Sequence, residues 1–227
     1  MPRGIFVTGT GTNVGKTVVS AALMARYRAE APLRYWKPIQ TGIEQDDDSA
    51  EVARLAGAGR GFTHRQDEIF NCGVRLPRPV SPHLAARLAG TRITVRSLVE
   101  HLDGDEETRW IVEGAGGVLV PINERETMAD LMGALDLPVL VTARSTLGTI
   151  NHTLMTIEAL RRRMLRVAGV VMVGEPNDEN RLAIEKYGAV EVIGQMPRFD
   201  PLTPETIERW VAAEFDRSGV LFVGCLR

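Results

Sequence analysis

Short apolar runs alternate with longer amphipathic stretches along most of this chain. The apolar runs are continuous rather than alternating, which is typical of parallel strands buried on both faces. They lie at residues 5–8, 34–38, 110–113, 139–142, 167–173 and 192–194, with a last candidate at 220–223. Helical spacing of apolar residues predicts helices over 17–29, 94–102, 128–135, 149–164, 178–187 and 204–215. We predict one α/β domain over residues 1–227, with a doubly wound, mostly parallel sheet and helices on both faces.

The first apolar run leads into a glycine-rich turn at residues 9–17, with the sequence GTGTNVGKT. Successive backbone N–H groups of such a turn surround phosphate oxygens, and the N-terminus of the following helix adds partial positive charge. Lys16 would reach the β- and γ-phosphates, and the Thr17 hydroxyl would bind Mg²⁺. Thr10 stands where the strict pattern G-x-x-x-x-G-K-[ST] has glycine. A chance Gly-Lys-Thr in a hairpin would lack the strand–turn–helix context, so we predict a nucleotide site of the P-loop NTPase type.

Residues after the other predicted strands are the next candidates, since ligands of such sheets lie beyond the carboxyl ends of the strands. Lys37 is either a second ammonium group near phosphate or a surface lysine, and the pattern favours neither. Capping is the favoured interpretation of the aspartates at 46–48, which precede a helical run. A role in metal binding requires one of them to face the P-loop. Glu113 ends a buried run before glycines at 114–117, where P-loop proteins hold a second Mg²⁺ ligand.

Two further stretches have a functional and a structural interpretation. Residues 57–92 lack clear periodicity and contain many glycines and prolines, which is more typical of a functional loop or lid than of a linker. His83, within this stretch, is more typical of a helix start or of packing than of catalysis. Residues 147–152 open the longest helical pattern, and Thr149 is a candidate N-cap whose neighbouring N–H groups would also suit a carboxylate.

Composition narrows the class of protein. The chain has 227 residues, of which 44% are hydrophobic and 25% charged, as in an ordinary globular domain. A net charge of −2 argues against a nucleic-acid partner or an anionic membrane surface. Cys72 and Cys225 have no C-x-x-C spacing and are expected to be reduced thiols. No signal peptide fits the N-terminus and no apolar run approaches the roughly 20 residues of a membrane span, so we expect a cytoplasmic protein.

Together these stretches resemble the dethiobiotin synthetase family, ATP-dependent enzymes that precede the last step of biotin synthesis. The resemblance rests on motifs that occur in family order over about 150 residues. They are residues 9–12 and 14–17, 37–38, 40–42, Asp48, 81–83, 112–117 and 147–152. The threonine at position 10 is itself the family's form of the loop, whereas the last 60 residues match weakly.

The resemblance implies a reaction. Enzymes of this family join CO₂ to one amine of 7,8-diaminononanoate as a carbamate, and ATP phosphorylates the carbamate to a carbamic–phosphoric anhydride. The neighbouring amine then closes the cyclic urea and expels phosphate. The family works as a homodimer, in which the 148–151 turn of one subunit binds the substrate carboxylate in the site of the other.

The resemblance also implies the role of each site residue. The catalytic charges are Lys16 and Lys37. The nucleotide-binding residues are Asn13, Val14, Gly15, Lys16, Thr17, Val18, Asp48, Glu113, Gly114, Ala115 and Gly116, with Pro197, Arg198 and Phe199 beside the base. The substrate-binding residues are Thr12, Lys37, Thr41, Gly148, Thr149 and Asn151. The Mg²⁺ ligands are Thr17, Asp48 and Glu113.

Two positions differ from many relatives. Asn13 replaces an acidic residue, and Gly174 stands where many relatives carry an asparagine that reads the base, so the preferred base stays open. A regulatory ATPase of the partitioning or septum-positioning type is the main alternative, but it has a second lysine near the start of the loop, where this chain has Gly11. A corrin-type amide synthetase would need a glutaminase domain, for which the chain has no room.

Overall fold

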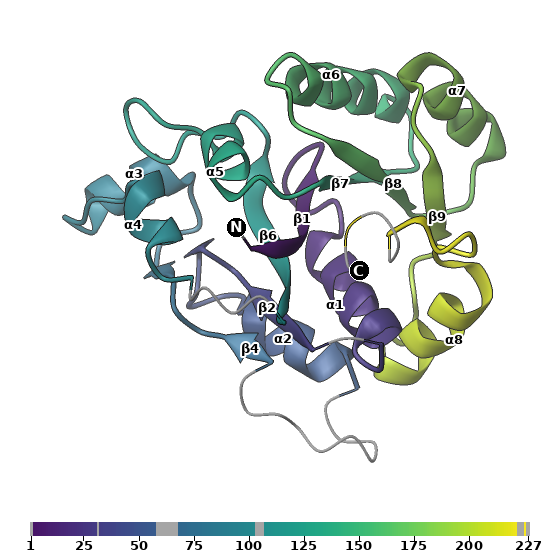
Figure 1. Ribbon diagram of the computed structural model, residues 1–227, viewed down its shortest axis with the longest axis horizontal. Helices are drawn as coiled ribbons and strands as arrows, with labels where there is room; N and C mark the ends of the chain where they lie inside the picture. The colour runs from purple at the N-terminus through teal and green to yellow at the C-terminus, as the bar shows by residue number, and fades with distance from the viewer. Residues whose placement is uncertain (1, 31, 58–67, 103–106, 222–224, 226–227) are drawn as a thin grey trace.

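Seven parallel strands form the central sheet of the computed structural model (Figure 1). The structure describes residues 2–30, 32–57, 68–102, 107–221 and 225. The strand order is β4-β2-β6-β1-β7-β8-β9. Their bounds are β1 Arg3–Gly9, β2 Leu33–Trp36, β4 Ile69–Phe70, β6 Arg109–Gly117, β7 Val139–Arg144, β8 Val167–Val173 and β9 Val192–Met196. The predicted doubly wound α/β fold is confirmed.

Helices cover both faces of the sheet. On one face lie α1 Lys16–Tyr27, α2 Asp48–Leu55 and α8 Pro204–Glu214. On the other lie α3 Pro82–Leu88, α4 Val95–Val99, α5 Met128–Leu135, α6 Thr149–Arg161 and α7 Asp178–Gly188. Successive strand residues enter opposite hydrophobic clusters: Phe6 packs toward α5 and α6, and Val7 toward α1. Burial on both faces explains why the strands are continuous apolar runs.

The second predicted strand is shorter than expected. It ends at Trp36 rather than at Pro38, because proline has no N–H to continue the ladder. The chain then forms a separate parallel pair, β3 Ile39–Thr41 with β5 Val74–Leu76, which the hydrophobic pattern did not predict. Three-residue strands are too short to show a period.

The irregular stretch at 57–92 contains more regular structure than expected, since β4, β5 and α3 lie within it. Residues 58–67 of this stretch lie outside the described part of the chain. His83 lies in the first turn of α3, as the helix-start interpretation predicts. Cys72 and Cys225 are free thiols, as expected.

The strand predicted at 220–223 is wrong. Val220 and Leu221 are helical, and the buried Leu221 donates its N–H to Asp216 Oδ2 at 3.1 Å. Phe222 and Val223 lie outside the described residues. A short apolar run is compatible with a strand and with a buried helix, and its periodicity cannot distinguish the two.

Candidate active site

The predicted P-loop lies between β1 and α1. Gly15 precedes α1 with φ 97°, and a Cβ there would lie 3.1 Å from the Val173 side chain, so the position requires glycine. The Nζ of Lys16 donates to the Gly11 carbonyl at 3.1 Å. Burial, and secondarily the charge of Lys37, lower the pKa of Lys16 to about 8. The loop therefore holds an ammonium group that would gain from an anionic partner.

Glu113 is the acidic centre of the site. It lies in β6 level with Val7 of β1, and its side chain is fully buried. The Thr17 hydroxyl lies 3.1 Å from Oε1, and Lys37 Nζ lies 2.6 Å from the same oxygen. The register of the parallel strands thus places the predicted acid beside the first turn of α1, where the nucleotide phosphates are expected.

Lys37 is a site residue rather than a surface lysine. Its side chain is 5% exposed, and its Nζ joins Glu113 Oε1 at 2.6 Å to Asp48 Oδ2 at 2.7 Å. Burial alone would lower the pKa of Lys37, but the charges of Glu113 and Asp48 raise it. The chain has only three lysines among its 27 basic residues, and two of them lie in this site. A lysine binds phosphate as a compact point charge, as the P-loop lysine does.

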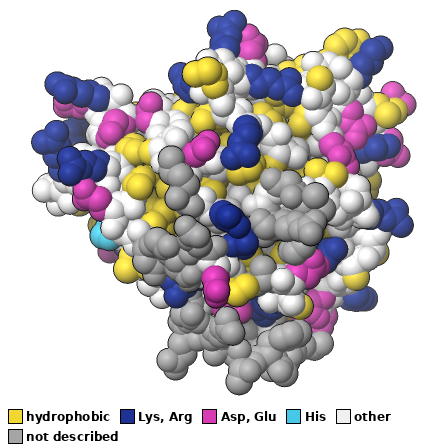
Figure 2. All heavy atoms as spheres, viewed as in Figure 1, with side chains coloured by type: hydrophobic (Ala, Val, Ile, Leu, Met, Phe, Trp, Pro, Cys, Tyr) yellow, Lys and Arg dark blue, Asp and Glu magenta, His cyan; other side chains and the backbone are white. Residues whose placement is uncertain are grey.

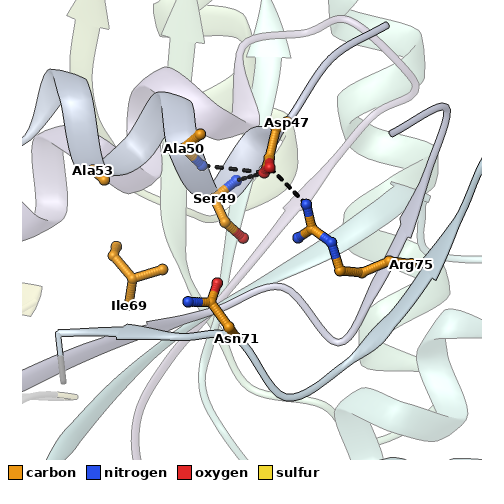
Figure 3. Close-up of a pocket in the computed structure, with 7 residues that line it drawn as sticks. All are labelled: Asp47, Ser49, Ala50, Ala53, Ile69, Asn71 and Arg75. Atoms are coloured by element: carbon orange, nitrogen blue, oxygen red, sulfur yellow. Dashed lines mark hydrogen bonds and ion pairs between the residues drawn. The ribbon is translucent and has the colours of Figure 1, made fainter. Parts of the chain in front are cut away.

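Among the aspartates at 46–48, one caps a helix and another faces the P-loop, so both roles that the sequence left open occur. Asp47 caps α2, because Oδ1 accepts the N–H groups of Ser49 and Ala50, and its Oδ2 pairs with Arg75 at 2.6 Å (Figure 3). These residues line a surface pocket of about 440 Å³. Asp48 turns the other way, and its Oδ1 accepts the Thr17 hydroxyl at 2.9 Å. Although burial opposes the shift, Lys37 lowers the pKa of Asp48.

The oxygens of Thr17, Asp48 and Glu113 therefore converge, as the predicted Mg²⁺ site requires. The single Thr17 proton is shared between two carboxylate oxygens, at 2.9 and 3.1 Å. Hard oxygen donors suit Mg²⁺, which keeps several waters and needs few protein ligands. Within the described residues, no cluster of three or more His, Cys, Asp or Glu side chains is arranged for a metal. A hydroxyl and two carboxylates beside the P-loop are the donor set that fits.

The other predicted substrate residues lie on further elements, and Thr41 is the last residue of β3. Thr12 lines a pocket of about 460 Å³, formed by the start of the P-loop, the turn after β6 and α6. The predicted N-cap at Thr149 is wrong: Gly148, with φ 91°, holds that position, and Thr149 is the first helical residue. Its hydroxyl lies 3.4 Å from that of Thr153. Asn151 is exposed in the same turn of α6.

Three residues that make contacts in the site were missed from the sequence. The hydroxyls of Ser20 and Tyr35 donate to Glu113 Oε2 at 3.0 and 2.9 Å. Arg144, at the end of β7, donates to the carbonyls of Thr12 and Asn13 at 3.4 and 3.3 Å. Ser20 follows Thr17 by three residues on one helix face, a spacing that could have indicated it. Nothing in the sequence distinguished Tyr35 from an ordinary core tyrosine.

Comparison with known proteins identifies the family of this site. A family model described as an AAA domain matches residues 3–206. The ATP-dependent dethiobiotin synthetase BioD of Paramagnetospirillum magneticum is 51% identical over 205 residues, which cover 90% of this chain and 93% of that protein. The protein of the same name from Agrobacterium fabrum is 42% identical and covers 98% of this chain and 99% of its own. The chain belongs to the ATP-dependent dethiobiotin synthetase family.

Solved structures that are similar to this family member share its fold alone. The septum site-determining protein MinD of Pyrococcus horikoshii, complexed with Mg-ADP, has a TM-score of 0.56 at 14% identity, over 97% of this chain and 93% of that one. A ParA family ATPase from Chlorobium tepidum has a TM-score of 0.53 at 10% identity, over 100% and 99%. These values confirm the predicted P-loop NTPase architecture.

Two further properties concern the hydrophobicity of the helices and the distribution of charge on the surface. Among the helices of the described residues, none combines the length and the hydrophobicity that crossing a bilayer demands. Figure 2 shows basic and acidic side chains interspersed over one face of the molecule, with hydrophobic side chains between them.

Proposed function

We propose that this site performs the ATP-dependent dethiobiotin synthetase reaction on 7,8-diaminononanoate and CO₂. One amine adds to CO₂ and loses a proton, which forms the carbamate. A carbamate oxygen attacks the γ-phosphorus of ATP, and ADP leaves. The second amine then attacks the carbonyl carbon of the anhydride and loses its proton, and phosphate leaves as the cyclic urea closes. The observation that carries this proposal, besides family membership, is the buried Lys37 that joins Glu113 to Asp48 close to the P-loop lysine, Lys16.

Charge explains why two lysines are needed. The carbamate, the triphosphate and the phosphoryl group in transit are all negative, so the reaction depends on positioning and positive charge. Lys16 would exchange its bond with the Gly11 carbonyl for the β- and γ-phosphates. Backbone N–H groups of residues 13–18 would surround the same phosphates. Residues 114–116 would approach them from β6, whose end at Gly117 lies level with Gly9 of β1.

Lys37 would act on the reacting groups themselves. Its ammonium would donate to the carbamate and to the phosphoryl group in transit, while Thr12 and Thr41 would hydrogen-bond the substrate. Mg²⁺, held by Thr17, Asp48 and Glu113, would neutralise phosphate charge as a Lewis acid. The phosphoryl transfer itself needs no general base, because the carbamate is already an anionic nucleophile.

We further propose that two copies of the chain complete each site. Gly148 begins the N-terminal turn of α6, where the N–H of Thr149 donates to the Thr146 carbonyl at 3.1 Å. The next N–H groups of this turn would bind the substrate carboxylate of the partner subunit. Leu119, Leu147 and Met155 are large exposed hydrophobic side chains in this region. Leu119 and Met155 line the same pocket as Thr12. Exposed apolar side chains grouped beside a pocket are typical of an interface.

The base of the nucleotide is proposed to lie against residues 197–199, which follow β9 at the ligand-binding edge of the sheet. Phe199 packs against the cluster between the sheet and α1, which would support such a platform. The cytoplasmic location stays a prediction from the sequence.

The test is phosphate release by the purified protein with bicarbonate and MgATP, with and without 7,8-diaminononanoate, repeated with CTP and GTP. We expect release that depends on the diamine and a product with the mass of dethiobiotin. Lys37→Ala should lower kcat strongly while nucleotide binding survives. Lys186→Ala, at the one exposed lysine, is the matched control. Hydrolysis that ignored the diamine with every nucleotide would overturn the proposal.

A regulatory ATPase switch is the second candidate that the sequence left open. Its support is the similarity to MinD and ParA proteins, which share the fold but only 10–14% of the sequence. The dethiobiotin synthetases are far more similar, at 42–51% identity over nearly the whole chain. Nucleotide-dependent binding of a partner without substrate turnover would be needed to favour the switch.

A further inference from the structure

The two carboxylate oxygens of Glu113 have different partners. Oε1 meets the Thr17 hydroxyl at 3.1 Å and Lys37 Nζ at 2.6 Å, on the side of the P-loop. Oε2 accepts the hydroxyls of Ser20 at 3.0 Å and Tyr35 at 2.9 Å, and all three side chains are buried. One oxygen therefore faces the reactive groups, and the other is held entirely by neutral donors from the scaffold.

The fold explains how these donors reach the same oxygen. Tyr35 in β2 lies level with Ile111 in β6, two residues before Glu113, and these residues face α1. Ser20 lies one turn after Thr17 in α1, so that both hydroxyls meet the carboxylate from the helix. Glu113 thus accepts hydrogen bonds from a neighbouring strand, β2, and from the P-loop helix, α1. Rotation of the carboxylate about its last bond would break both bonds to Oε2.

We propose that Tyr35 and Ser20 are positioning residues, which hold Oε2 of Glu113 so that Oε1 alone is presented to Mg²⁺ and to Lys37. The proposal rests on the metal-binding role of Glu113 in the proposed function. Hydrogen bonds to a ligating carboxylate fix its orientation, and their loss costs metal affinity. Burial of the Glu113 carboxylate costs free energy, and Lys37 pairs with Oε1 only. The hydroxyls of Tyr35 and Ser20 offset part of that cost at Oε2.

The hydroxyl of Tyr35 is separable from its packing. The ring is fully buried in the cluster between the sheet and α1, which a phenylalanine of the same shape would fill equally well. The oxygen adds nothing to that packing, and it donates its hydrogen bond to Glu113 Oε2. Tyr35→Phe therefore removes one bond to the carboxylate and leaves the core intact.

The experiment measures nucleotide binding by calorimetry in Mg²⁺ titrations and, separately, in excess EDTA, so that turnover is not the readout. In Tyr35→Phe, the Mg²⁺ concentration for half of the effect should rise about tenfold, within the range for loss of an outer hydrogen-bond partner. Affinity in EDTA should be unchanged. Ser20→Ala should shift the Mg²⁺ dependence in the same direction.

Tyr27→Phe is the matched control. Tyr27 is also fully buried, and its hydroxyl donates to a carboxylate, Asp216, outside the site. This variant should lose stability without any change in Mg²⁺ dependence. An unchanged Mg²⁺ dependence in Tyr35→Phe, or an equal loss of affinity in EDTA, would overturn the inference. Failure of the wild-type protein to form dethiobiotin would overturn the proposed function alone, because Mg²⁺-dependent binding is measured independently of the product.

Discussion

Replacement of Lys37 by methionine tests whether the acidic centre depends on a single ammonium group. The wild-type Nζ lies 2.6 Å from Glu113 and 2.7 Å from Asp48, with 5% of the lysine side chain and none of the glutamate exposed. Lys37→Met keeps the length of the side chain but leaves two neighbouring carboxylates without a directly paired cation. Removal of one partner of a buried ion pair costs about 3–5 kcal/mol.

We expect the lower end of that range, about 3 kcal/mol, because three neutral donors still hold Glu113 and Asp48 is partly solvated. For a chain of this size the loss corresponds to a fall in Tm of about 6–12 °C. Urea unfolding at pH 7 without nucleotide measures the difference. Lys186→Met, at an exposed position, should change stability by less than about 0.5 kcal/mol.

Added MgCl₂ should then restore part of the lost stability of Lys37→Met, since a divalent cation between the carboxylates supplies the missing charge. A loss below about 1 kcal/mol would refute the reasoning, because the pair would then behave like an exposed ion pair. Equal effects of MgCl₂ on the wild-type protein and the variant would likewise contradict a shared carboxylate site.

Three further predictions follow from the geometry. Glu113→Gln should raise the Mg²⁺ concentration needed for half-maximal nucleotide binding by more than about tenfold, measured by calorimetry. An unchanged Mg²⁺ requirement would mean that Glu113 has a structural role only. Because the pKa of free Lys16 is about 8 and phosphate favours the charged form, binding at pH 8.5 should take up roughly three-quarters of a proton, and almost none at pH 6.5. Calorimetry in two buffers measures that uptake, and no difference between the two pH values would contradict it. Gly15→Ala should cost about 1–2 kcal/mol and lower nucleotide affinity, whereas Gly90→Ala, with φ 63° in open space, should leave binding unchanged.

The sequence by itself determined six of the seven strands of the central sheet and the P-loop, and it indicated Glu113 as the acid of the site. Each follows from a local pattern: a continuous apolar run marks a strand buried on both faces, and a glycine turn before a helix marks a phosphate site. The predicted end of the strand at Glu113 is wrong, because β6 continues through the glycines to Gly117, but Glu113 still faces the first turn of α1.

Only the tertiary structure decided which polar groups meet. Asp47 and Asp48 are adjacent in sequence, yet one caps α2 and the other reaches Thr17, because successive side chains at a helix start point in different directions. The burial of Lys37 depends on strands far apart in the chain, as does the bond from Tyr35 to Glu113. Local pattern describes the neighbourhood of each residue along the chain, whereas these contacts arise from the order and register in which distant strands pair.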